Sequence, residues 1–295
     1  NNATTGEIFV NPADLGEADF TGSLADMVAI ANNALTAAQI TAGGQNGFRG
    51  LADATFTLND TGVISIADLV ILDGATSGTD HINADTATGL TGTYADATVI
   101  YNKGGADNAT FTADLDDKPL TLTGTVTVAE ATAAAGYTTG ILTATVSDTA
   151  ANLKALANEG TNKITVSMTG TTAAAADVIL VNADTASLIT STVGTITGSA
   201  ADLKTVFAAN DGTQLTGFET AAVTISSPGA SVADANTISA GTTGVVSGAI
   251  TTTDMATLKT LGETGNAYTV TVADATITAA DLKTLNSKTT GTVTA

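Results

Sequence analysis

A short pattern that recurs along the chain limits its possible folds more than any other feature of the sequence. It reads Ser or Thr, two alanines, Asp or Asn, Leu, Lys, any residue and a final apolar residue. The clearest copies are residues 149–156, 199–206 and 278–285, and looser copies surround Asp177 and Asp234. The copies return roughly every 24 to 28 residues, which is the length of one coil in a repeat protein. The chain is therefore expected to stack similar coils on one another.

Each copy of the pattern is expected to form a short helix. In the last copy, Thr278 is the predicted N-cap, and Asp281 reaches back toward it from the electropositive first turn. Leu282 and Leu285, four and seven residues after the cap, fall on one face and are predicted core residues. Lys283 is predicted to be a surface residue. A helix of two or three turns is too short to be stable alone, so it must pack against neighbouring coils.

The segments between these helices alternate apolar residues with threonine, as in residues 120–128, 163–168 and 268–272. Such alternation is typical of strands that pack on one face and meet water on the other. Stacked strands of this kind would form parallel sheets along the array. The predicted fold class is mainly β, a β-solenoid-like or stacked β-repeat architecture with short capping helices. An α/β solenoid is the alternative.

The repeat is regular only in the second half of the chain, which suggests two domains. Residues 126–295 are predicted to be the repeat domain, and residues 1–125 a separate α+β region. This first region contains the longest predicted helix, over about residues 23–40. Ser23 and Asp26 mark its beginning as a capping pair.

Two further segments of the first region are predicted to be extended: residues 63–72, which follow a turn, and residues 97–101. A second phrase, Ala-Asp-Ala-Thr, recurs at residues 52–55, 95–98 and 273–276. Its Asp is expected to hydrogen-bond the backbone two residues on and so to form a turn between strands.

The charge of the chain excludes two classes of partner. Asp and Glu total 29 against 9 Lys and Arg, which gives a formal net charge of -20. Nucleic acid and anionic membrane surfaces would both repel such a protein. The sequence has no cysteine, no apolar run long enough for a membrane span and no signal peptide at its start. The chain is therefore expected to be a mature product or a piece of a larger protein, with no membrane insertion.

No catalytic constellation stands out, and the chain is not expected to be an enzyme. His81 is the one histidine, so a histidine triad or a two-histidine zinc site cannot be assembled. A glycosidase-like carboxylate pair stays open among the 29 acids, but tryptophan is absent and tyrosines number 4. Sugar-cleaving clefts usually offer more aromatic surface than this.

Calcium is the ligand that the acidic residues suit best, because it takes six to eight oxygen ligands from carboxylates and carbonyls. The alternative is a solvated acidic surface in which the carboxylates serve as caps and turns. No other cofactor is expected. The candidate calcium ligands come from two clusters: Asp73, Asp80, Asp85, Asp114, Asp116 and Asp117.

Two strings carry a resemblance to a known group of proteins: Val-Ser-Asp-Thr-Ala-Ala-Asn-Leu at residues 146–153, and Thr-Val-Ala-Asp-Ala-Thr-Ile-Thr-Ala-Ala-Asp-Leu at residues 271–282. They resemble the Thr/Ala/Asp-rich repeat regions of large secreted surface proteins of marine bacteria and cyanobacteria. The resemblance covers residues 125–295. It implies a surface-layer, adhesin or fibre component. Many such proteins carry calcium-binding Gly-Gly-x-Gly-x-Asp nonapeptides, which this chain lacks.

Together these features predict a structural, extracellular bacterial protein at the cell surface. Its expected partners are copies of itself, assembled into a surface layer, sheath or filament, and a cell-surface glycan is a further candidate. The alternatives are an adhesin or carbohydrate-binding module and a segment of a phage tail fibre. A sugar-binding module would need a concave patch of Tyr, Asn and Asp.

Overall fold

The chain divides into two compact units in the computed structural model. Unit 1 comprises Asn1–Thr145 with Thr161–Lys163, and unit 2 comprises Val146–Gly160 with Ile164–Ala295. The division lies beyond residue 125, the boundary expected from the sequence, and helices alternate with strands in both units. The residues that the structure describes are 8–9, 19–34, 47–49, 51–76, 82–101, 115–156, 162–185 and 187–295.

The prediction of a mainly-β architecture is wrong, because the fold is α/β. The described residues contain ten α-helices and mostly parallel strands, and helix (34%) exceeds strand (29%). Helices therefore do not merely cap a β structure. They form a layer of their own, because each carries an apolar face that must be buried.

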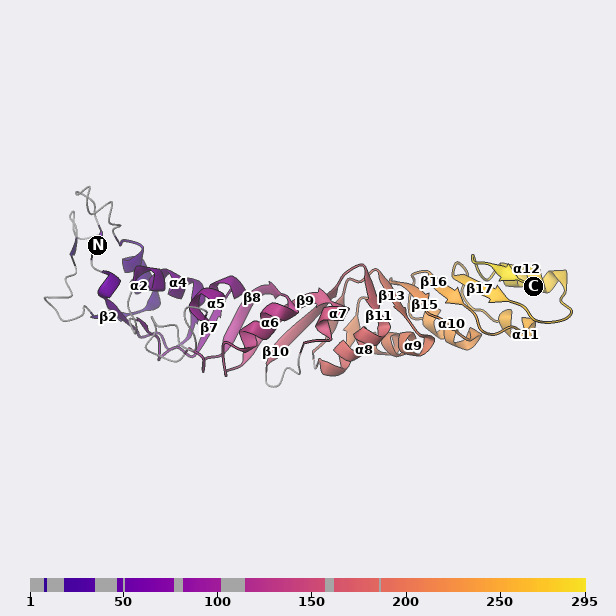
Figure 1. Ribbon diagram of the computed structural model, residues 1–295, viewed down its shortest axis with the longest axis horizontal. Helices are drawn as coiled ribbons and strands as arrows, with labels where there is room; N and C mark the ends of the chain where they lie inside the picture. Colours follow the sequence, from indigo (N-terminus) through magenta and orange to yellow (C-terminus); the bar gives the residue numbers. More distant parts are fainter. Residues whose placement is uncertain are drawn as a thin grey trace. The chain divides into compact units, whose positions relative to one another are not determined.

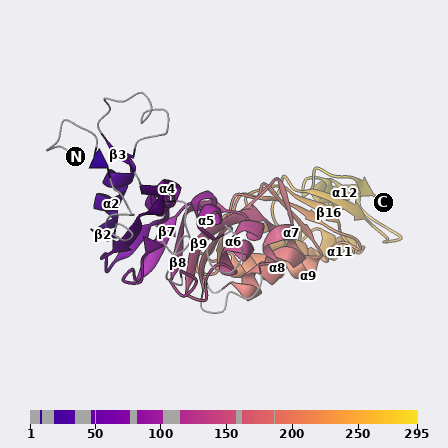
Figure 2. The ribbon, with the colours of Figure 1, turned by 60° about the vertical axis from the view of Figure 1, so that its left-hand side comes forward.

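Unit 1 consists of helices joined to short parallel strands. Its described helices are α2 (Leu24–Ala31), the 3₁₀ turn η1 (Leu51–Asp53), α4 (Ile66–Ala75), α5 (Tyr94–Tyr101) and α6 (Val128–Ala135). Its strands are β1 (Ile8–Phe9), β2 (Asp19–Gly22), β3 (Phe48–Arg49), β4 (Thr55–Leu58), β5 (Val63–Ser65), β6 (Ile82–Asn83), β7 (Gly89–Gly92) and β8 (Leu120–Val126). β1 pairs with β3, β2–β4–β6 form one parallel series, and β5–β7–β8 form another. Helices α4, α5 and α6 follow one another in Figure 2.

Unit 2 repeats the same order of strand and helix. Its helices are α7 (Ala150–Leu153), α8 (Ala175–Asp184), α9 (Ala200–Ala209), α10 (Val232–Ser239), α11 (Met255–Leu258) and α12 (Ala279–Asn286). Its strands are β10 (Lys163–Thr169), β11 (Thr172–Ala174), β12 (Ile189–Ser191), β13 (Thr195–Gly198), β14 (Leu215–Thr216), β15 (Ala222–Ile225), β16 (Val246–Ala249), β17 (Ala267–Thr271) and β18 (Val293–Thr294). Strand β9 (Leu142–Thr149) begins in unit 1 and ends in unit 2, and Lys163, the first residue of β10, belongs to unit 1.

Strands of successive coils in unit 2 pair in parallel and in register. β11, β13, β15, β16, β17 and β18 form one sheet in chain order, and β10, β12 and β14 are neighbours in another. Ile196 of β13 lies between Ala173 of β11 and Val223 of β15, and all three side chains are buried. Figure 1 shows α8, α9 and α10 side by side along one edge of this unit, with β13, β15, β16 and β17 beside them. Equivalent apolar residues therefore stack coil on coil to make the core.

The coils approach each other closely at a glycine. A Cβ atom on Gly198, at the end of β13, would lie 2.7 Å from the Cβ of Ala175, the first residue of α8 in the preceding coil. Neither atom belongs to a flexible side chain, so backbone would have to move. The small residues at these positions thus set the spacing between coils.

The predicted helix capping is confirmed in the clearest copies of the pattern, but it is wrong for α8, whose N-cap Ala174 makes no side-chain capping hydrogen bond. Ser199 accepts a hydrogen bond from the amide of Asp202, and Thr278 does the same for Asp281. Thr127 and Glu130 complete a reciprocal capping box at α6. A cap of this kind satisfies an amide that has no partner within the helix. The helices that have a side-chain cap of this type are α2, α4, α5, α6, α7, α9, α10, α11 and α12.

Two segments predicted to be strands are helices. Residues 66–75 form α4, since Ser65 caps the amide of Asp68, and only residues 63–65 of the predicted segment are extended. Residues 97–101 belong to α5, which Thr93 caps through the amide of Asp96. In both cases the cap and the packing of the helix outweigh the strand preference of the β-branched residues.

The predicted long helix is shorter than expected. α2 begins after Ser23, as predicted, but ends at Ala31. The side-chain amide of Asn33 then donates to the carbonyl oxygen of Ala29 at 2.7 Å. This hydrogen bond satisfies an acceptor in the last turn of the helix. Residues 35–40 lie outside the described part of the chain.

The turn predicted for the Ala-Asp-Ala-Thr phrase is also wrong at two of its copies. Asp96 lies in the first turn of α5 and accepts from the Thr93 hydroxyl at 2.7 Å. Asp274 accepts from the amide of Met255 at 2.6 Å, so it caps the helix of the preceding coil. These carboxylates stabilise helix beginnings rather than strand turns.

Candidate functional site

Lysines join successive helices of unit 2 in pairs. Lys154, just after α7, donates to Asp177 of α8 at 2.7 Å, and Lys259, just after α11, donates to Asp281 of α12 at 2.5 Å. Lys204 of α9 pairs with Asp234 of α10. Each lysine stands five residues after an N-cap, and each acid stands three residues after the next N-cap. The pairing is therefore a property of the repeat and not of one site.

Two of these pairs lower the pKa of their carboxyl groups, those of Asp234 and Asp281. The hydrogen bond from Lys204, followed by that from Ser231, lowers the pKa of Asp234. The hydrogen bond from Lys259, followed by that from Thr278, lowers the pKa of Asp281 in the same way. The carboxylates stay charged at neutral pH and act as contacts between coils.

A second kind of hydrogen bond also joins a helix to the coil that follows it in the sequence. The first amide of α10, on Val232, donates to the Thr252 hydroxyl at 3.3 Å, and the first amide of α2, on Leu24, donates to Asp60 at 2.7 Å. Together with Met255 and Asp274, these bonds show that the following coil supplies a cap to the helix before it. At α2, α10 and α11, the following coil thus satisfies the first amide of the helix before it.

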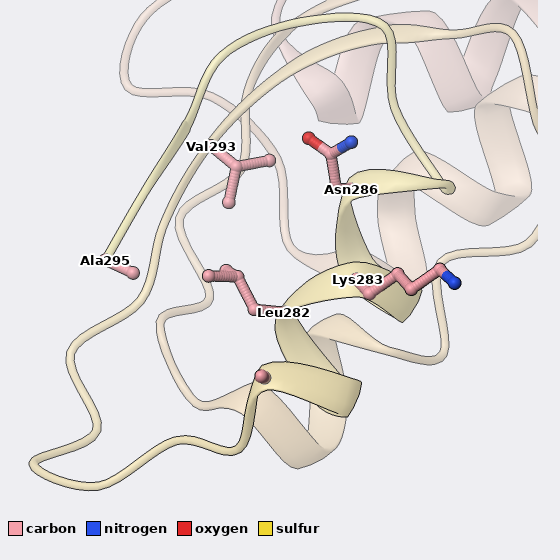
Figure 3. A pocket seen from close by; sticks show the side chains of 6 residues that line it. Leu282, Lys283, Asn286, Val293 and Ala295 are labelled. Atoms are coloured by element: carbon pink, nitrogen blue, oxygen red, sulfur yellow. The ribbon is translucent and has the colours of Figure 1, made fainter.

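In α12, the last helix, the side that would face a following coil is open to solvent. A hollow of about 570 Å³ lies against it, and we call its lining residues the end face: Ala279, Leu282, Lys283, Asn286, Val293 and Ala295. Figure 3 shows Leu282 directed toward the side where Val293 and Ala295 lie, whereas Lys283 extends away on the other side of the helix.

Comparison with earlier coils shows what the end face lacks. Leu203 and Leu258, four residues after their N-caps, are fully buried (0% exposed). Leu282 occupies the same repeat position and is half-buried, and Ala279 is exposed where its equivalent Ala175 is buried. The prediction that Leu282 is a core residue is therefore wrong for this copy, whereas Leu285 is buried as predicted. Among the described residues, α12 is the last helix, and no further helix lies against this side of it.

The predicted calcium ligands do not gather within the described residues. Asp73 is buried in α4, whereas Asp85 is exposed and its carbonyl oxygen accepts from Lys118. Asp117 pairs with Lys118 at 3.2 Å, and the carbonyl of neighbouring Asp116 accepts from the Thr139 hydroxyl. Within these ranges, no group of three or more His, Cys, Asp or Glu residues could hold a metal ion. Asp80, Asp114 and His81 lie outside the described residues, so calcium binding stays a prediction.

Three tyrosines of unit 1 form an aromatic cluster, separate from the stacked pair Phe20 and Phe56. The rings of Tyr101 and Tyr137 stack at 5.0 Å, and those of Tyr94 and Tyr137 at 6.4 Å. Burial, with the nearby charges of Asp116 and Asp117, raises the pKa of Tyr101. All three rings are half-buried, so the cluster is partly open to solvent and sugar binding stays a prediction.

The lysine pairs were missed by the sequence analysis, although their signal is visible in the printed sequence. A Leu-Lys pair follows the capping segment at residues 153–154, 203–204, 258–259 and 282–283. A lysine at one fixed repeat position with an acid at another indicates a contact between coils. The sequence predicted only that Lys283 is a surface residue. The lysines at the same repeat position, Lys154, Lys204 and Lys259, bind carboxylates of another coil.

The described residues contain no helix that is both long and apolar enough to cross a membrane. Comparisons with protein-family models, curated proteins and solved structures found no match to this chain.

Proposed function

We propose that this protein is a structural subunit that assembles with copies of itself. The observation that carries the proposal is the way in which the coils of unit 2 contact one another: their strands pair in parallel and in register, and a lysine of one coil binds an acid of another. Leu282 on α12 is half-buried, whereas Leu203 and Leu258 at its repeat position are fully buried. Because contacts of this kind join similar coils, the end face also suits a coil of a second copy.

The energetics favour covering this surface. Full burial of a leucine side chain is worth roughly 1.5–3 kcal/mol, and here only part of that is gained. A stacked coil would also pair the open edge of β18, which in the described structure bonds only to β17. Open edge strands readily accept another strand.

The net charge of -20 opposes association, because copies repel each other. Salt screens this repulsion over a Debye length of about 10 Å at 0.1 M. Assembly should therefore increase when the salt concentration is raised from about 0.02 M to about 0.3 M, while specific contacts at close range persist.

The proposal places the assembly outside the cell, as a surface layer, sheath or filament. The supports for this location are the absence of cysteine, the richness in Thr, Ala and Asp, and the resemblance to secreted repeat proteins. A test is to label intact and broken cells that express the protein with an impermeant amine reagent. Labelling only after breakage would contradict a surface location.

The assembly itself is tested by light scattering after size-exclusion chromatography, across protein and salt concentrations, with negative-stain microscopy of the same samples. The expected result is a mass that rises with protein concentration and reaches regular multimers. A monomer of 28.9 kDa at every concentration and salt level would refute the function proposed.

A further inference from the structure

The outer side of one sheet in unit 2 carries small side chains in rows. Ile196, Val223 and Val246 are buried on the inner side of β13, β15 and β16. Because side chains alternate along a strand, the neighbours of these residues point outward. We call the outward side chains of β11, β13, β15, β16 and β17 the row face. Strand pairing places five of them side by side, and none of the five is buried: Ala174, Thr197, Thr224, Ser247 and Ala267.

The row face is uncharged, although the chain is strongly acidic. All six strands of this sheet are described, and none of them contains Asp, Glu, Lys or Arg. The formal net charge of the chain is -20, and acids of unit 2 such as Asp177, Asp202 and Asp234 lie on its helices. Two row faces can therefore meet without bringing like charges into contact, which would be unfavourable elsewhere on the surface.

The hydroxyl groups of the row face already have partners within the sheet. Ser247 donates to the carbonyl oxygen of Val223 on the preceding strand at 3.0 Å, and Thr197 donates to that of Ala173 at 3.5 Å. A polar group that keeps a hydrogen bond costs less to remove from water than an unpaired one. Val245, directly before β16, is 52% exposed and adds an apolar side chain to this side. The row face can therefore lose its water at low cost.

We infer that the row face of one copy packs on the row face of a second copy. The inference rests on the self-assembly proposed above and names a surface for it. The two faces are identical, so the contact has two-fold symmetry and pairs two copies without adding more. Small side chains bury little apolar area, so a single pair of faces associates weakly, and the contact becomes stable where many copies in an array act together. The expected assembly is a filament of two arrays packed face to face.

A lysine at the centre of the row face tests the contact. Thr224→Lys places a charge where the two faces meet, and removing this charge from water is unfavourable. Thr205→Lys, at an exposed threonine of α9, makes the same change in charge outside the row face. Both substitutions make the net charge less negative, so an effect of net charge alone would favour assembly in both. In electron microscopy, filaments of Thr224→Lys should have half the mass per unit length of the wild type, whereas those of Thr205→Lys should equal the wild type.

A cysteine gives a second measurement that adds no charge and decides the matter if Thr224→Lys does not fold. The sequence has no cysteine, so Thr224→Cys introduces a single thiol. In the assembled protein this thiol should react with a maleimide at least about tenfold more slowly than in dilute monomer, because the core of an interface is packed as densely as a protein interior. Thr205→Cys is the control and should react equally fast in both states. Circular dichroism shows whether each variant is folded.

The outcomes separate this inference from self-assembly in general. A halved mass per unit length in Thr224→Lys but not in Thr205→Lys, with a protected thiol in Thr224→Cys, supports the paired row faces. A wild type that assembles together with a folded Thr224→Lys of equal mass per unit length, or with an unprotected thiol in Thr224→Cys, overturns the row-face contact and leaves self-assembly standing. A wild type that stays monomeric overturns both.

Discussion

Asp234 accepts two hydrogen bonds that differ in what they stabilise. The bond from Ser231 belongs to its own helix, and the bond from Lys204 belongs to the coil before it. The first can be predicted from the sequence, because Ser followed by Asp three residues later is a helix-start pattern. The second cannot be predicted from one copy, because it depends on how far apart the coils lie. Only the recurrence of both residues along the chain indicates it.

The capping hydroxyl should contribute measurably to stability. Ser199→Ala removes the acceptor for the Asp202 amide, which stands at 3.1 Å, and should lower the free energy of unfolding by about 1 kcal/mol. Urea unfolding followed by circular dichroism measures the change. Ser226→Ala, at an exposed serine outside any helix, is the control and should change stability by less than about 0.5 kcal/mol. Equal effects of the two substitutions would contradict a capping role for Ser199.

The lysine pair should make stability depend on pH in the acid range. Because pairing holds the pKa of Asp234 below its ordinary value of about 3.9, the contribution of the pair is complete above that value. It is lost as the pH falls through the lower pKa of the folded state. Lys204→Met should therefore cost well under about 1 kcal/mol at pH 7, since the pair is half-exposed, and progressively less as the pH falls below the folded-state pKa of Asp234. A cost that stays constant between pH 7 and pH 2 would show that Lys204 acts by packing.

At the scale of whole elements, capping signals proved more reliable than strand preference. The segment 63–72 is rich in Val, Ile and Leu and was predicted to be extended, yet Ser65 and Asp68 mark the helix that most of it forms. Thr93 and Asp96 mark α5 in the same way. The pattern that identified the helices of unit 2 was thus present in unit 1. The fold class was predicted wrongly because β-branched residues were given more weight than these caps.

Leucines at one repeat position should differ in cost according to whether a coil covers them. Leu203→Ala, at a fully buried residue of α9, should cost about 2–5 kcal/mol of unfolding free energy. Leu282→Ala, at the half-buried equivalent in α12, should cost about 1 kcal/mol or less when the protein is monomeric. Urea unfolding at low protein concentration measures both. Equal costs would mean that α12 is covered in the monomer.

At the scale of the whole molecule, repetition determines both the core and the surface that it leaves open. Contacts between neighbouring coils recur in unit 2 as three lysine–carboxylate pairs and as caps that the following coil supplies to α10 and α11, so stability is built from contacts between neighbours. The sequence predicted the short capped helices and the parallel strands, whereas the mainly-β class that it predicted for them is wrong. It could not predict the end face, because a repeat position looks the same in the sequence whether it is covered or open. The contrast between Leu203 and Leu282 became visible only in the structure.

The most direct test of the account is the molar mass of the wild type and of Leu282→Asp, measured side by side by light scattering. Leu282 is half-buried, so the variant should fold, which circular dichroism verifies. A charged group on the end face must lose water when a second copy docks, which is unfavourable for an unpaired carboxylate. The account predicts multimers for the wild type and a monomer of about 28.9 kDa for the variant. Equal masses for the two proteins would contradict it.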